Sequence, residues 1–119
     1  NALYYCESLR SITVSPYNSI YSSVSGVLYN KEKTKLILYP SCKTDSQFTI
    51  PDGVVSIGGF AFLRCMFLNK VVIPRGVTIV EEVAFVECVN AAIHAQAEGK
   101  PSGWHDRWYS EIGSLRWNA

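Results

Sequence analysis

Hydrophobic and polar residues follow the same order twice between residues 48 and 93, in the segments FTIPDGVVSIGGFAFLRCMFLNK and VVIPRGVTIVEEVAFVECVNAAI. Eight positions match at a constant offset of 23 in residue number, which indicates an internal repeat. Apart from a proline and a glycine, the matching positions are small or hydrophobic and are predicted to face the core. They are Ile50, Val54, Ile57, Ala61, Phe62 and Cys65 in the first copy, and Ile73, Val77, Val80, Ala84, Phe85 and Cys88 in the second.

Each copy is predicted to form one coil of a β-rich α/β solenoid. Residues 48–50 and 71–73 read as short strands that end at a proline, because proline has no amide hydrogen to donate. A glycine then permits a turn, and a second short strand is expected at 54–57 and 77–80. The segments GGFAF and EEVAF are predicted to form one brief helical turn, with the alanine and the phenylalanine facing inward.

Residues 1–14 match the second half of the repeat when Cys6 is aligned with Cys65, at an offset of 59. The chain is therefore expected to start inside a coil and to be a piece of a longer protein. Solenoids normally carry a polar cap at each end. We expect the N-terminal edge to be exposed or packed against another molecule, which allows edge-to-edge self-association.

Residues 15–47 are interpreted as an insertion that contains a β-hairpin. Two apolar runs, at 27–29 and 36–39, flank a polar connection and are predicted to pair. Isolated hairpins are only marginally stable, so this one should extend or cover the sheet of the solenoid. Tyr29 and Tyr39 are expected to cover part of that sheet.

Residues 94–119 break the repeat and contain all three tryptophans, Trp104, Trp108 and Trp117. Bulky amphipathic side chains there can seal the end of the solenoid as a C-terminal cap. Alternatively, Trp104 and Trp108 can form a platform for a sugar or a peptide, because aromatic residues dominate binding hot spots. The single domain is thus divided into a partial repeat (1–14), a hairpin insertion (15–47), two repeats (48–70 and 71–93) and a cap (94–119).

Composition excludes several functional classes. The 119 residues contain 11 Lys and Arg against 10 Asp and Glu, with no clustered basic patch, so no nucleic-acid partner is expected. No apolar run is long enough to span a bilayer, so no membrane insertion is expected. The N-terminus lacks the charge and apolar pattern of a signal peptide.

The four cysteines invite a disulfide or metal interpretation, which the repeat argues against. Cys6, Cys65 and Cys88 align at one core position, where a free cysteine behaves as a small buried hydrophobe. No CxxC pair supports a zinc site, and we predict neither a metal nor a cofactor.

The repeat resembles the BspA-like leucine-rich repeats, whose pattern is, loosely, IPxxVxxIGxxAFxxCxxLxxI. The first copy fits nearly every fixed position, whereas the second places Glu81 and Glu82 where the first has Gly58 and Gly59. The resemblance implies leucine-rich-repeat coils, and the observed period of 23 lies within the range of that class. It also implies a place on the surface of a host-associated bacterium or parasitic protist, with a role in protein interaction or adhesion.

No catalytic residues are predicted. His105 and Asp106 lie beside serines, but a triad is defined by geometry rather than by adjacency, and no GxSxG motif is present. Cys88 could pair with His94, but it occupies a core position of the repeat, where a thiol is buried and inert.

We therefore predict a non-enzymatic interaction or adhesion module of a larger secreted or cell-surface protein, with a host or cell-surface protein as its partner. Outward strand positions are the candidate contacts, because side chains alternate between core and surface along a strand. Two alternatives stay open, a glycan-binding tip formed by the tryptophans and a structural spacer. The candidate partner-binding residues are Thr49, Lys70, Val72, Arg75, Trp104 and Trp108.

Overall fold

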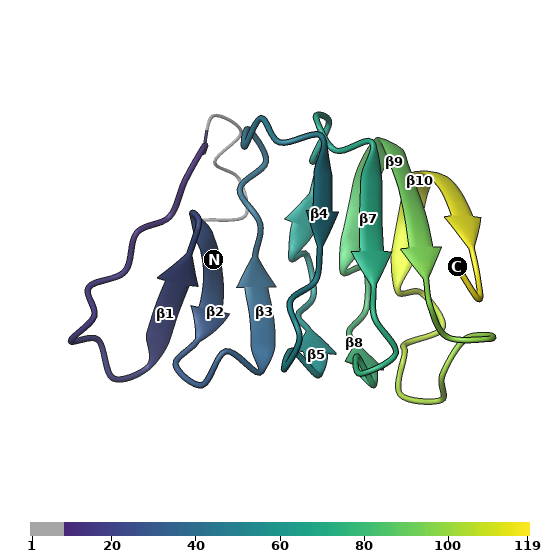
Figure 1. The fold of residues 1–119 in the computed structure, drawn as a ribbon. Coiled ribbons are helices and arrows are strands. Elements are labelled where there is room, and N and C mark those ends of the chain that lie inside the picture. The colour runs from purple at the N-terminus through teal and green to yellow at the C-terminus, as the bar shows by residue number, and fades with distance from the viewer. Residues whose placement is uncertain (1–8) are drawn as a thin grey trace.

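The structure, a computed structural model, describes residues 9–119, and these form ten strands without a helix (Figure 1). Most strands are short, and only the last two exceed four residues. The strands are β1 (Tyr21–Val24), β2 (Val27–Asn30), β3 (Lys35–Leu38), β4 (Gln47–Thr49), β5 (Ser56–Ile57), β6 (Phe62–Leu63), β7 (Lys70–Ile73), β8 (Ile79–Val80), β9 (Phe85–Ala95) and β10 (Tyr109–Arg116).

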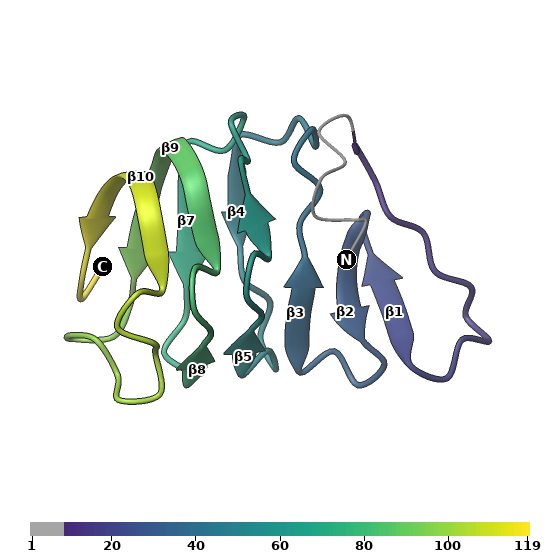
Figure 2. The same ribbon diagram turned by 180° about the vertical axis from the view of Figure 1, so that it is seen from behind.

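The strands form two five-stranded sheets that enclose the core (Figures 1 and 2). The first sheet has the order β1-β2-β3-β5-β8, and the second runs β10-β9-β7-β4 with β6 on the first half of β9. Equivalent strands of successive coils pair in parallel, as β5 does with β8 and β4 with β7. This stacking is that of a β-solenoid, as the repeat predicts.

The predicted helical turn is wrong, because the chain makes a single tight turn there without forming a helix, and a strand begins directly afterwards, at Phe62 and at Phe85. Ala61 donates its amide to the carbonyl of Gly58 at 3.2 Å, which closes a single turn. Residues on either side of the following strand then take left-handed dihedrals, with φ of 59° at Phe60 and 55° at Arg64. Such single left-handed residues turn the chain through a corner and prevent a right-handed helix from continuing. The amides of the strand are consequently bonded to the next coil, as that of Phe62 is to Ala84 at 2.8 Å.

The hairpin predicted at 27–39 is confirmed and is larger than expected. β2 and β3 pair in antiparallel fashion, and β1 adds a third strand through a two-residue turn at Ser25 and Gly26, both with positive φ. β3 pairs in parallel with β5, so the hairpin extends the first sheet. Tyr29 and Tyr39 are 2% and 1% exposed, and they therefore belong to the core rather than to its cover.

Part of the insertion is itself a coil of the solenoid. Tyr39, Phe62, Phe85 and Trp108 recur at a constant interval of 23 in residue number, and their rings form one column through the core. Ring centroids are 5.2 Å apart between Tyr39 and Phe62, 4.5 Å between Phe62 and Phe85, and 6.0 Å between Phe85 and Trp108. We call these four residues the aromatic column. The boundary predicted at residue 47 therefore divides a coil.

The predicted partial repeat is not seen in the part of residues 1–14 that the structure describes; Cys6 lies outside that part. Ile12 and Val14 are half-buried and belong to no strand, whereas their proposed equivalents in β7 are fully buried. The amide of Ile12 instead donates to the carbonyl of Gly26 at 2.9 Å, so this segment lies beside the hairpin.

Large apolar side chains are exposed at the N-terminal end of the solenoid. Tyr17 and Ile20 are 94% and 63% exposed, and Tyr21 and Val24 of the edge strand β1 are also exposed. These residues lie in the predicted insertion rather than in the partial coil at 1–14, whose open edge stays a prediction. Self-association through this end stays a prediction.

The cysteines of the two repeats are buried thiols, as predicted. Cys65 and Cys88 are at most 1% exposed, and Cys88 Sγ donates to the carbonyl of Phe62 at 3.1 Å. The hydrogen bond with Cys88, together with burial, raises the pKa of the Cys65 thiol, which keeps it protonated and unreactive.

Candidate functional site

The outward side of the second sheet presents one continuous face. Along β4, β7, the second half of β9 and the end of β10, side chains alternate between core and solvent, as strand geometry requires. We call the outward set the ladder face. It consists of Gln47, Thr49, Lys70, Val72, Ala92, His94, Ser114 and Arg116.

Strand register aligns the ladder face in two rows of four residues. One row is Thr49, Val72, His94 and Arg116, and the other is Gln47, Lys70, Ala92 and Ser114. Neighbours within a row lie about 4.8 Å apart, which is the spacing of paired strands. The rows therefore place side chains from residues 47 to 116 within one small, flat surface.

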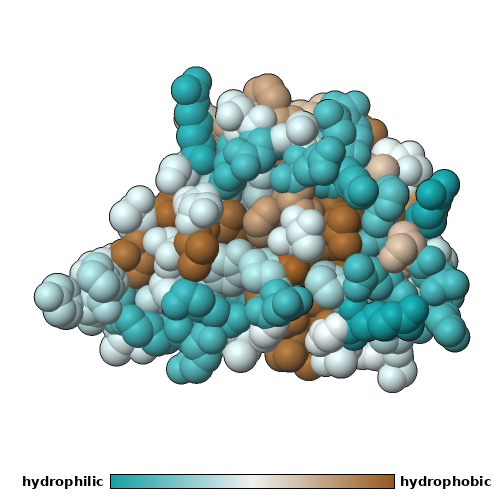
Figure 3. All heavy atoms as spheres, in the orientation of Figure 1, coloured by the Kyte–Doolittle hydropathy of each residue, from teal (hydrophilic) through white to brown (hydrophobic). Residues whose placement is uncertain are grey.

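The ladder face combines unpaired positive charge with small apolar groups. It carries two cations, Lys70 and Arg116, and no Asp or Glu, and the His94 imidazole lies on the strand between them. Among residues 9–119, no carboxylate forms an ion pair with Lys70 or Arg116. Val72 and Ala92 lie between these polar groups and are half-buried. Figure 3 shows this side of the molecule, where hydrophobic residues lie in small groups between hydrophilic ones.

Two predicted contacts, Thr49 and Val72, lie on one row of the ladder face, and Lys70 lies on the other. Arg75 does not belong to it, because it follows β7 at a corner of the coil and donates from Nη2 to Asn118 Oδ1 at 3.2 Å. Asp52 occupies the equivalent corner of the preceding coil, and Glu98 lies one residue past the equivalent corner of the following coil. Arg75 is thus part of an exposed corner of mixed charge.

His94, Ala92 and Arg116 were missed by sequence reasoning because the repeat changes length. β4 pairs with β7 at an offset of 23, but β7 pairs with β9 at an offset of 22, as Val72 does with His94. A constant offset of 23 would place His94 beside Val71, which faces the core. The signal that could have found it is the alternation of Ala91, Ile93 and Ala95 as inward residues.

Trp104 and Trp108 are core residues, which corrects their prediction as partner contacts. Each is 2% exposed, and their rings meet edge-on with centroids 4.9 Å apart. Trp104 Nε1 donates to the carbonyl of Val77 at 3.1 Å, and Trp117 packs on both rings. The indole faces are therefore used inside the cap and are not available to a sugar.

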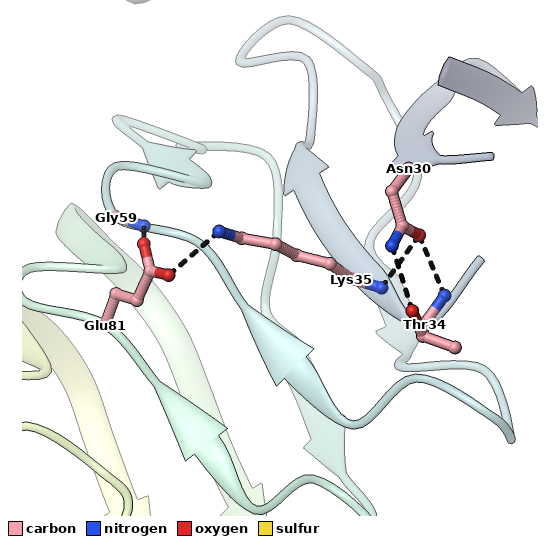
Figure 4. A network of polar contacts seen from close by, with 5 residues as sticks. All are labelled: Asn30, Thr34, Lys35, Gly59 and Glu81. Carbon is pink, nitrogen blue, oxygen red and sulfur yellow. Dashed lines mark hydrogen bonds and ion pairs between the residues drawn. The ribbon is translucent and has the colours of Figure 1, made fainter. Parts of the chain in front are cut away.

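A polar network on the first-sheet side links three parts of the chain (Figure 4). Glu81 accepts a hydrogen bond from Lys35 Nζ at 2.8 Å through Oε2 and one from the Gly59 amide at 3.0 Å through Oε1. The bond from Lys35, opposed by desolvation and assisted by the Gly59 amide, lowers the pKa of the Glu81 carboxyl. Asn30 holds the hairpin connection by accepting from the amides of Thr34 and Lys35 through Oδ1. Glu81 thus stands where the first repeat has a glycine, and its two hydrogen bonds connect neighbouring coils.

The other pockets and polar clusters of the described residues do not form a better-defined site than the ladder face. An open hollow of about 380 Å³ lies between β8 and the cap, beside Glu82 and His105. Within residues 9–119, no group of three or more His, Cys, Asp or Glu side chains is placed to hold a metal ion. The same part of the chain contains no helix that is long and apolar enough to cross a membrane.

The chain belongs to the BspA-type leucine-rich repeat family. The model of the BspA type leucine rich repeat region matches residues 32–98, which is more than half of the chain. The match starts within the hairpin, in agreement with the coil that the structure shows there. Comparison with curated protein sequences found no significant match.

Solved structures with the same fold come from bacteria. A leucine-rich repeat protein from Eubacterium ventriosum is 26% identical, with a TM-score of 0.62 over 80% of this chain and 32% of its own. A leucine rich cell surface protein from Faecalibacterium prausnitzii is 21% identical, with a TM-score of 0.73 over 100% of this chain and 44% of its own. The pneumococcal vaccine antigen PcpA is 18% identical, with a TM-score of 0.58 over 92% of this chain and 40% of its own. The chain thus spans less than half the length of each of these proteins.

Proposed function

We propose that this domain is a non-enzymatic protein-interaction module of a larger bacterial cell-surface protein, with the ladder face as its binding surface. The observation that carries the proposal is the continuous register of outward side chains from Thr49 to Arg116 across four parallel strands. No described segment of the chain covers this face, so a partner can reach it. Similar structures include a cell surface protein and a vaccine antigen, which supports a surface location.

The physical character of the face supports binding of a protein rather than catalysis. Its backbone is held by paired strands, so binding orders side chains without the further cost of ordering backbone on this surface. Its mixture of apolar and polar groups is compatible with a non-obligate interface, which as a whole is only about as apolar as the rest of a protein surface. Function is assigned from this surface, because the fold alone hosts many functions.

Site-specific photo-crosslinking tests the proposal. Benzoylphenylalanine is introduced in place of Thr49 on the ladder face or, as a matched control, in place of Thr78, which is exposed beside the first sheet. Each variant is irradiated with a detergent extract of epithelial cell surfaces and with an extract of bacterial cell walls. We expect a discrete, saturable protein adduct from position 49 and none from position 78.

The result also separates the remaining alternatives. Equal adducts from both positions, or adducts from position 78 alone, would contradict the assignment of the ladder face. No adduct from either position in either extract would favour a structural spacer that presents other domains of a longer chain.

A further inference from the structure

We infer that the ladder face binds an acidic, extended protein segment in which an aliphatic side chain lies between two carboxylates. This inference rests on the proposed function and names the chemistry of the partner. Lys70 and Arg116 would pair with the carboxylates, and His94 would donate a hydrogen bond between them. Val72 and Ala92 would contact the aliphatic side chain.

The spacing of the two cations carries the inference. Lys70 on β7 and Arg116 on β10 are separated by two strand spacings and by two residues along the strand direction. Their Cα atoms are therefore about 12 Å apart, with β9 between them. In an extended peptide, residues four apart lie on the same side at about 13 Å, and the residue midway between them points the same way. An acidic, aliphatic, acidic pattern at alternate positions thus matches the diagonal of the ladder face.

The two cations of this face have no carboxylate partner among the described residues, in contrast to some other lysines of the solenoid. Lys35, Lys43 and Lys100 each form an ion pair with a carboxylate, at 2.8, 3.0 and 3.2 Å respectively. Lys70 and Arg116 form none within residues 9–119, although they lie on the same face of one sheet. Like charges held on one face without a counter-ion favour an anionic partner and speed its association.

The apolar part of the face favours a peptide over an acidic polysaccharide. Ala92 flanks the midpoint of the diagonal and Val72 lies beside it on β7. Their methyl groups suit an aliphatic side chain better than a hydroxylated sugar ring. The ladder face carries no Phe, Tyr or Trp, and Trp104 and Trp108 are buried in the cap. The surface therefore lacks the large aromatic rings on which sugars stack.

Fluorescence anisotropy with a synthetic peptide tests this inference. The probe is a fluorescein-labelled peptide of about ten residues that alternates Glu, Val and Glu at every second position, separated by Ser. We expect saturable binding at low ionic strength that weakens with added salt, because exposed charge pairs are screened. A peptide of the same sequence with Gln in place of Glu should bind at least tenfold more weakly.

Charge reversal locates the binding site. The double variant Lys70→Glu/Arg116→Glu is compared with Lys33→Glu/Arg107→Glu, which changes net charge equally at exposed positions away from the ladder face. We expect the first to lower affinity at least tenfold and the second by less than threefold. Lys70→Gln/Arg116→Gln, which adds no repulsion, should show an intermediate loss, and circular dichroism confirms the fold of each.

Three results would overturn the inference. They are no binding of the Glu peptide, equal losses in the two charge-reversed variants, or displacement of the peptide by a sulfated polysaccharide that binds more tightly. The proposed function fails separately, through the absence of a selective adduct at position 49. A selective adduct together with indifference to charge reversal would mean that the face binds protein by other contacts.

Discussion

Replacing Phe62 by alanine tests how strongly the aromatic column stabilises the solenoid. The Phe62 ring is fully buried and packs between Tyr39 and Phe85, stacked on Phe85 with an interplanar angle of 8°. Phe48 contacts the same ring at a centroid distance of 6.1 Å. Loss of a buried phenylalanine costs about 3–5 kcal/mol through lost transfer free energy and the cavity left behind. Both neighbouring rings are fixed by their own coils, so the cavity cannot collapse easily and the upper part of that range applies.

A loss of this size is a large part of the roughly 5–15 kcal/mol by which a domain is stable. At roughly 4 °C per kcal/mol for a domain of this size, a loss of about 4–5 kcal/mol should lower the melting temperature by about 16–20 °C. Urea denaturation monitored by circular dichroism measures the free energy directly, and an unchanged m-value shows that only stability has changed.

The matched control is Phe67→Ala, five residues further along the chain. Phe67 is 51% exposed, so its replacement should change the free energy of unfolding by less than about 0.5 kcal/mol. A loss below about 1 kcal/mol for Phe62→Ala, or equal losses for the two variants, would refute the role assigned to the aromatic column.

Three further substitutions probe single polar groups. Tyr39 Oη is buried without a hydrogen-bond partner, so Tyr39→Phe should be neutral or stabilising by up to about 1 kcal/mol. Burial raises the pKa of Tyr39 above that of the unfolded chain, so the free energy of unfolding of the wild type should fall above about pH 10. The free energy of unfolding of Tyr39→Phe, measured by urea denaturation, should fall less over the same pH range. Glu81→Gln should cost at most about 1 kcal/mol at pH 7, because the ion pair with Lys35 is exposed. Since the folded-state pKa of Glu81 is lowered, that difference should disappear as the pH falls below about 4.3, and its persistence at pH 2 would contradict the assignment. Trp104→Phe removes the donor to the Val77 carbonyl and should cost about 1–3 kcal/mol in urea unfolding; no loss would show that this bond contributes nothing.

The repeat predicted most of the solenoid because its signal is regular. Inward residues recur at an interval of 23, so strands, turns and core positions in 48–93 could be assigned by comparing the copies. The same interval also relates Tyr39 to Phe62 and Trp108 to Phe85. These pairs were missed because their surroundings do not match the repeat, although the side chains fill the same place in the core.

The local conformation at the corners could not be predicted from residue type. Phe60, Arg64 and Val83 adopt left-handed dihedrals that non-glycine residues take uncommonly. Hydrogen bonds between coils impose these corners, since the amide of Phe60 donates to the carbonyl of Val83 at 3.0 Å. Tertiary pairing therefore overrides the local preference on which the expected helical turn was based.

The candidate site was predicted in part, for a similar reason. Alternation along a strand identified Thr49, Lys70 and Val72, whose strands lie within the regular repeat. His94 and Arg116 lie where the register shifts and β10 carries a bulge, which position counting cannot follow.

The most direct test of the ladder face as a protein-binding surface is a chemical-shift map of the ¹⁵N-labelled domain. The domain is titrated with the purified partner that crosslinks at position 49. The account predicts that the largest amide shifts fall in residues 70–73, 92–95 and 114–116. Largest shifts in the hairpin at 21–38 or in the loop at 98–106, with the ladder face unchanged, would contradict it.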